Sequence, residues 1–205
     1  MAWIIVGIAA LVVVIQISIV VGIEHYRLKK NAKLVDSFKV SQQHVKTLAV
    51  YFSRSGNTKL MAYQIAEIKK GNILNLEARD YPIGFKGWVN AMSDARKTNA
   101  IISHQKVDLS AYDTLYIGSP IWLYSPAPPV FEFVRTNDFT GKKVILFNSL
   151  NSKFEQKYID EFSALVRKNG GEFINTASEQ LATELIAPDA PSRCGVRLAT
   201  SPSSG

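Results

Sequence analysis

Six consecutive residues combine hydroxyl, amide and glycine groups in a pattern that could bind an anion. They are Ser53, Arg54, Ser55, Gly56, Asn57 and Thr58, between an apolar run and a helical pattern. Backbone N–H groups and the helix dipole favour an anion at such a turn, and neutral side-chain donors suit a phosphate monoester. The loop lacks the glycine patterns of nucleoside triphosphate and dinucleotide sites. Serine, asparagine and threonine also begin many helices, so a simple N-terminal cap is an equal alternative on these residues alone.

The elements around this loop alternate between apolar runs and amphipathic patterns. The apolar runs predict strands over residues 47–52, 72–76, 113–118, 143–147 and 172–175, and the patterns predict helices over residues 58–68, 89–98, 130–136 and 153–168. Strands separated by helices imply crossover connections and an open α/β sheet of about five parallel strands. Such sheets bind ligands at the carboxyl ends of their strands. The candidate site therefore reduces to the loops 53–58, 119–129 and 148–152.

Three stretches of the chain resemble the flavodoxin family, in the right order and spacing from about residue 47 to residue 175. Residues 50–58 are similar to the family's loop for the FMN phosphate, with a Ser-x-Ser-Gly-Asn-Thr run after the first strand. Residues 112–122 resemble the third strand and its flavin-contacting loop, and residues 141–152 resemble the fourth strand and the second flavin loop. The resemblance implies a doubly wound five-stranded parallel sheet that binds FMN non-covalently.

The two later loops have the chemistry that a flat, mostly apolar flavin ring needs, namely stacking surfaces and backbone hydrogen bonds. The resemblance assigns Pro120, Ile121, Trp122, Leu123 and Tyr124 to the first of them, and Asn148, Ser149, Leu150 and Asn151 to the second. Trp122 is expected to contact the ring, with ordinary core packing as the alternative. Tyr124 could instead face solvent or a partner. No catalytic residue and no metal ligand is expected, because the three histidines lie outside these loops.

Residues 3–23 contain no charged side chain and predict a transmembrane anchor. As a helix they would span roughly 31 Å, which matches the hydrocarbon core of a bilayer. A cleaved signal peptide fits less well, because Met1 and Ala2 supply no basic side chain and no small-residue cleavage pattern follows. A buried core helix is the other alternative, although it is seldom apolar over this length.

The basic charge of the chain is concentrated directly after that apolar segment. Residues 24–46 carry six Lys or Arg against two acidic residues, which is more than half of the net charge of +7. This pattern predicts a basic linker beside a membrane rather than a nucleic-acid-binding face. Positive charge on this flank predicts a single-pass protein of the cell membrane, with a short N-terminus outside and the domain of residues 47–187 in the cytoplasm.

Composition excludes several other classes. With 47% apolar residues the chain can build a core, and a single cysteine excludes an intrachain disulfide framework or a zinc site built from cysteine pairs. The C-terminal residues 188–205 are rich in Pro, Ser and Gly and predict a disordered tail. Residues 178–187 leave room for a short final helix at most, so the completeness of the last helix is in question.

Three functions are compatible with these features. The first is a membrane-anchored FMN protein that transfers electrons to or from a redox partner protein. The alternative is an FMN-dependent NAD(P)H oxidoreductase that reduces a quinone or a similar small acceptor. A non-redox membrane module with a vestigial fold is a third, but the intact loop 53–58 argues against it. Fold alone does not separate the first two.

Overall fold

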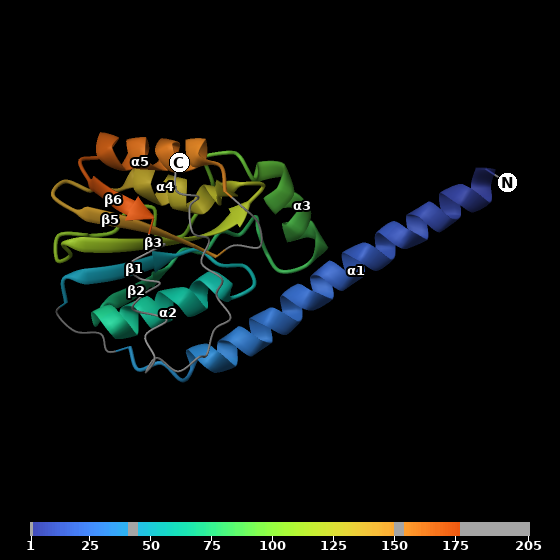
Figure 1. The fold of residues 1–205 in the computed structure, drawn as a ribbon, viewed down its shortest axis with the longest axis horizontal. Helices are drawn as coiled ribbons and strands as arrows, with labels where there is room; N and C mark the ends of the chain where they lie inside the picture. Colours follow the sequence, from blue (N-terminus) through green and yellow to red (C-terminus); the bar gives the residue numbers. More distant parts are fainter. Residues whose placement is uncertain (1, 41–44, 150–153, 177–205) are drawn as a thin grey trace, which may run out of the picture.

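The structure, a computed structural model, describes residues 2–40, 45–149 and 154–176. A long N-terminal helix precedes an α/β domain (Figure 1). The strands are β1 (Thr47–Tyr51), β2 (Asn72–Asn75), β3 (Thr114–Trp122), β4 (Ser125–Pro126), β5 (Lys143–Ser149) and β6 (Glu172–Thr176). The helices are α1 (Ala2–Val35), α2 (Asn57–Lys69), α3 (Phe85–Asp94), α4 (Pro128–Thr136) and α5 (Gln156–Lys168).

Five parallel strands form the main sheet, in the order β2-β1-β3-β5-β6. From β1 the chain first places β2 on one side and then places β3, β5 and β6 in turn on the other side, as in other doubly wound sheets. The central strands are buried and apolar, which is typical of strands covered by helices on both faces. The prediction of a five-stranded parallel sheet is therefore confirmed.

Helices cover both faces of the sheet, so the domain has three layers (Figure 1). Alternate residues of β1 point to opposite faces. Leu48 and Val50 join the larger core beneath α4 and α5, whereas Ala49 and Tyr51 join a smaller core with α2. In the larger core, the buried rings of Phe131 in α4 and Phe162 in α5 meet edge to face, 5.4 Å apart. These two cores hold the sheet edge that carries the candidate site.

The largest departure within the domain is in the predicted loop 119–129. Strand β3 continues to Trp122, because its pairing with β5 extends as far as Pro120 opposite Ser149. It then turns into the short antiparallel strand β4, and α4 begins at Pro128. The helix predicted over residues 89–98 lies earlier, as α3. The final helix considered for residues 178–187 and the tail 188–205 lie outside the described residues.

Helix α1 continues without a break into the basic segment 24–46 and ends at Val35, so the first part of that segment is helical. Its last turns lie against α2, where Asn31 and Val35 are buried. These contacts explain why a charged, unperiodic segment is helical here. For the described residues, no helix meets the combination of length and apolar character that crossing a membrane needs, so a transmembrane helix over residues 3–23 is not supported.

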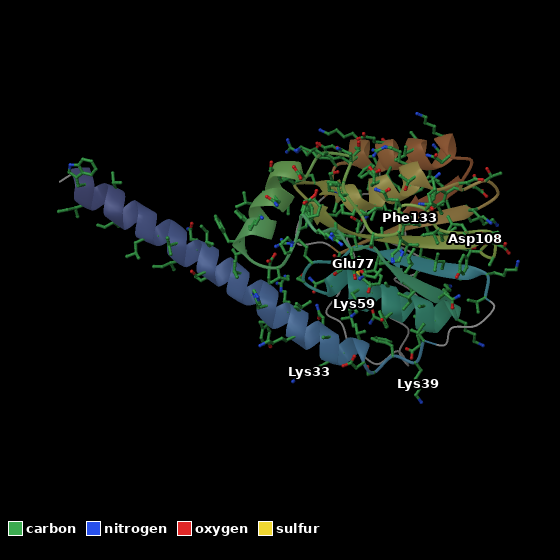
Figure 2. The ribbon with its side chains drawn as sticks, turned by 180° about the vertical axis from the view of Figure 1, so that it is seen from behind. Lys33, Lys39, Lys59, Glu77, Asp108 and Phe133 are labelled. Carbon is green, nitrogen blue, oxygen red and sulfur yellow. The ribbon has the colours of Figure 1, made fainter. Side chains whose placement is uncertain are left out.

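The first half of α1 nevertheless stands clear of the domain with apolar side chains exposed around it (Figure 2). The exposed large side chains there include Trp3, Ile4, Val6, Ile8, Leu11, Val14, Ile15 and Ile19. Near the other end of the helix, Lys33 lies beside the domain (Figure 2). Helix α1 thus has an unpacked apolar half and a packed polar half.

Candidate functional site

The carboxyl ends of β1, β3 and β5 meet at one edge of the sheet, where a cavity of about 370 Å³ lies. Nine residues predicted from the sequence line it: Ser53, Arg54, Ser55, Asn57, Thr58, Pro120, Ile121, Trp122 and Ser149. The structure thus brings the loop after β1 together with the ends of β3 and β5. Six further lining residues were not predicted, namely Val20, Ile23, Glu24 and Arg27 of α1 and Trp88 and Met92 of α3.

The loop 53–58 turns directly into α2 at Gly56. This residue has a left-handed backbone with φ of 84°, which glycine adopts without strain. The N-cap position of α2 is Gly56 itself, which makes no side-chain cap bond, so the first backbone N–H groups of the helix are not bound by the side chain of an N-cap residue. Asn57 and Thr58, the first residues of α2, line the cavity, so the positive end of the helix dipole lies at the cavity, where it favours an anion.

Thr58 connects this loop to the end of β5. Its side chain is 1% exposed, and its hydroxyl oxygen lies 2.7 Å from that of Ser149 at the end of β5. Either hydroxyl can donate in this bond. This bond joins two segments whose residues are 91 positions apart in the sequence, and both residues line the cavity.

Arg54 binds protein groups from two other segments, α1 and the loop before α3. Its Nη1 and Nη2 donate to Oε1 and Oε2 of Glu24 at 2.8 and 3.0 Å, and Nη2 also donates to the carbonyl oxygens of Pro82 and Gly84. The Arg54 side chain is 6% exposed. Burial lowers the pKa of its guanidinium, and the carboxylate of Glu24 opposes that shift. Much of the positive charge of Arg54 is therefore balanced in a bidentate ion pair with the carboxylate of Glu24.

Two tryptophans line the cavity, Trp122 of β3 and Trp88 of α3. Trp122 is largely buried, with edge-to-face contacts to Phe52 at 5.6 Å and Tyr81 at 5.0 Å. Core packing therefore accounts for much of its ring, although it still lines the cavity. The Tyr81 hydroxyl donates to Asp94 of α3, and burial raises the pKa of Tyr81.

Half-buried Trp88 and Met92 of α3 supply the apolar surface that sequence reasoning missed. They are four residues apart and so lie on one face of the helix. Placing α3 over residues 89–98 hid this pair, because Trp88 then fell outside the helix. The signal that could have found them is Gly84, because α3 begins directly after it. Gly84 has a φ of 107°, a backbone angle that only glycine adopts readily.

Leu123 and Tyr124 form the tight turn between β3 and β4. Both have positive φ, at 42° and 74°, where Asn-Gly would be the usual pair. Their side chains are about two-fifths exposed, and neither lines the cavity. Backbone strain of this kind is concentrated at ligand sites, because a functional loop can retain it against stability.

The end of β5 carries an unusual polar atom. Asn148 Oδ1 is buried and has no hydrogen-bond partner among the described residues. A buried acceptor without a partner is costly, which makes it a candidate contact for a ligand N–H group. Leu150 and Asn151, the other predicted residues of this loop, lie outside the described residues.

The parallel sheet, its strand order and the position of the cavity at the carboxyl ends of the strands are typical of a flavodoxin-like α/β protein. The family model described as Flavodoxin matches residues 46–186. Because this match covers well over half of the chain, the protein belongs to the flavodoxin family, which confirms the resemblance seen in the sequence.

Two solved structures show the same fold. A candidate flavoprotein of Bacteroides uniformis is 27% identical over 69% of this chain and 97% of its own, with a TM-score of 0.54. A flavoprotein of Lactobacillus acidophilus in complex with FMN is 26% identical over 64% of this chain and 91% of its own, with a TM-score of 0.52. No curated protein sequence matches the chain.

Proposed function

We propose that this protein binds FMN in the cavity at the carboxyl edge of the sheet and transfers electrons through it. The observation that carries the proposal is the joining of the loop 53–58 to the end of β5 through Thr58 and Ser149, beside the apolar surface of Trp88. The FMN complex of the similar Lactobacillus acidophilus flavoprotein supports the same ligand. Bound FMN supplies reversible uptake of one or two electrons.

The residues present fit this cofactor in both charge and shape. The cavity of about 370 Å³ lies within the usual range for small-molecule sites. Ser53, Ser55 and the N-terminal end of α2 would hold the phosphate, and Trp88 with Pro120 would flank the ring. Asn148, whose Oδ1 is buried without a partner among the described residues, precedes Ser149 but does not itself line the cavity.

Full-length protein purified in detergent is expected to bind FMN more tightly than riboflavin by two orders of magnitude or more. The donors of the loop act on the phosphate, and each charge-assisted hydrogen bond is worth about 1.5–3 kcal/mol. Quenching of flavin fluorescence on titration measures both affinities. Equal affinities would remove the phosphate assignment, and failure to bind either flavin would favour the non-redox module.

A second candidate function is FMN-dependent reduction of a quinone or a similar small acceptor. It is favoured by an apolar cavity of about 550 Å³ between α1 and α3, lined by Ile17, Val21 and Phe85 among others. This cavity shares Val20 and Trp88 with the flavin cavity. An apolar acceptor held there would lie next to the flavin. Rapid bleaching of the bound flavin by NADH or NADPH, followed by reoxidation by a soluble quinone, would support the enzyme over a carrier that needs a protein donor.

The apolar half of α1 is the basis of a third element of the proposal, attachment to a membrane. Most of its described exposed side chains are large and apolar, and the basic residues Lys29, Lys30 and Lys33 follow within a few turns. Exposed apolar surface of this extent is unfavourable in water and favourable in lipid. With positive charge on the inner side, the domain would face the cytoplasm as part of a single-pass protein.

Full-length protein is expected to remain in the membrane pellet through high-salt and alkaline washes, because apolar burial is insensitive to both. Release by salt would show peripheral attachment through the basic residues 24–46, and release by alkali alone would show a helix lying on the surface. Cleavage of the domain by protease in inverted vesicles, and not in intact cells, is the expected result for a cytoplasmic domain.

A further inference from the structure

We propose that Asn31 of α1 is a positioning residue of the FMN site, because its amide holds the phosphate loop of residues 53–58 in the conformation that binds the anion. This inference rests on the proposed function. It extends the cofactor site to the N-terminal helix, since Asn31 lies outside the match to the flavodoxin family over residues 46–186. The packed half of α1 then has a role in cofactor binding as well as in attachment.

Asn31 joins the last turns of α1 to the loop 53–58. The residue is 7% exposed, and its Nδ2 donates to the carbonyl oxygen of Ser55 at 3.1 Å and to Oδ1 of Asn57 at 2.7 Å. An amide nitrogen has two N–H donors, and the two bonds use both of them. The orientation of the loop relative to α1 is therefore fixed at two atoms.

The bond to Asn57 orients a second amide group. Asn57 is the first residue of α2, and it lines the flavin cavity. Its amide accepts through Oδ1 and donates through Nδ2. Because Asn31 binds the acceptor end, it orients the donor end of Asn57 for an anion, whereas a flipped amide would present an oxygen to the phosphate.

The bond to Ser55 fixes the backbone of the same loop. A trans peptide is planar, so its C=O and N–H groups point in opposite directions. Holding the Ser55 carbonyl oxygen toward α1 therefore also fixes the direction of the Gly56 N–H group. A Cβ added at Gly56 would lie 3.0 Å from that of Asn31, which shows how closely the helix and the loop fit at this turn.

The pair of Glu24 and Arg54 holds the same loop at a second point. Glu24 lies seven residues before Asn31, which is two helical turns and so the same face of α1. Arg54, its partner, is the second residue of the loop. The ion pair attaches the helix to the loop, and Asn31 orients the groups that bind the phosphate.

The test compares Asn31→Ala with Asn137→Ala in the full-length protein. Asn137 is 6% exposed, and its Nδ2 also donates to two backbone carbonyl oxygens, at the end of α4 and apart from the residues that line the cavity. Asn31→Ala is expected to lower the affinity for FMN by about tenfold or more and to leave that for riboflavin unchanged, because riboflavin has no phosphate. Asn137→Ala should lower stability and leave the ratio of the two affinities unchanged.

A double variant tests whether Asn31 acts through Asn57. The loss of FMN affinity in Asn31→Ala with Asn57→Ala is expected to be smaller than the product of the two single losses, because the first side chain orients the second. A loss equal to that product would show that the two side chains act independently, which contradicts a positioning role.

The two flavins also separate this inference from the proposed function. Equal losses for FMN and riboflavin in Asn31→Ala, or no loss for either, would overturn the inference while leaving FMN binding intact. Binding of neither flavin by the wild-type protein would overturn the proposed function itself.

Hydrogen exchange of the wild-type protein gives a measurement that does not depend on the variants. Coupling between two binding events is reciprocal, so a phosphate bound to the loop should in turn hold α1 against it. FMN is therefore expected to slow exchange of the amides of residues 28–35 more than riboflavin does. Equal protection by both flavins, or none, would contradict the role of Asn31.

Discussion

Replacing Ser55 and Thr58 together by alanine is expected to lower the affinity for FMN by two orders of magnitude or more, with little change for riboflavin. Both hydroxyl groups lie at the wall of the cavity, and each hydrogen bond to the phosphate dianion is worth about 1.5–3 kcal/mol. Thr58→Ala also frees the hydroxyl of Ser149 from its bond at 2.7 Å, which loosens the junction of the two loops. Parallel titrations with the two flavins measure the effect.

The matched control for this variant is Ser110→Ala with Thr140→Ala. These residues are exposed and precede β3 and β5, at the edge of the sheet opposite the cavity. Removal of one serine and one threonine hydroxyl there should leave both affinities unchanged. A similar loss for FMN and riboflavin in the Ser55, Thr58 variant would show that the hydroxyl groups support the fold and not the phosphate.

Breaking the pair between Glu24 and Arg54 is expected to weaken the attachment of α1 to the domain by about 3 kcal/mol. Glu24→Leu would leave the Arg54 guanidinium, 6% exposed, with two backbone carbonyl oxygens and no counter-charge. An uncompensated buried charge costs more than the pair contributes, so the double variant Glu24→Leu, Arg54→Met should recover much of the loss. Native-state hydrogen exchange of residues 24–35 measures the free energy of opening.

An exposed ion pair provides the comparison. Lys46 and Asp113 lie 3.7 Å apart with side chains 73% and 63% exposed, and Lys46→Met should change the free energy of unfolding by less than about 1 kcal/mol. Additive losses in the Glu24 and Arg54 variants, with no recovery in the double variant, would show that the two charges act independently.

The sheet and the phosphate side of the site could be predicted because their signals are local. The apolar run that forms β1 is buried by helices on both faces, and the loop after it contains its own turn residue at Gly56. A parallel sheet then brings the ends of β1, β3 and β5 to one edge without further information. Nine of the predicted residues meet around one cavity for this reason.

The rest of the site depends on contacts between distant residues. Glu24 and Arg54 are 30 positions apart, so the helical state of residues 24–35 follows from partners that the local pattern does not reveal. The turn at Leu123 and Tyr124 lacks the glycine that usually marks it, which is why residues 119–129 suggested a loop. Trp122 lines the cavity, and its contacts with Phe52 and Tyr81 show the core packing that the sequence left open as the alternative for this ring.

Because α1 is one continuous helix whose last turns pack against α2, the domain is attached to the C-terminal end of a long, straight helix. Its 34 residues measure about 51 Å along the axis, and the apolar half extends away from the sheet (Figure 1). A flexible chain of the same length would let the domain tumble, because a random coil transmits no orientation. A stiff helix would instead keep the cavity at a constant distance and in a constant orientation relative to any surface that binds the N-terminal end of α1. Partners would then be selected by geometry, since a donor or acceptor must reach one fixed opening.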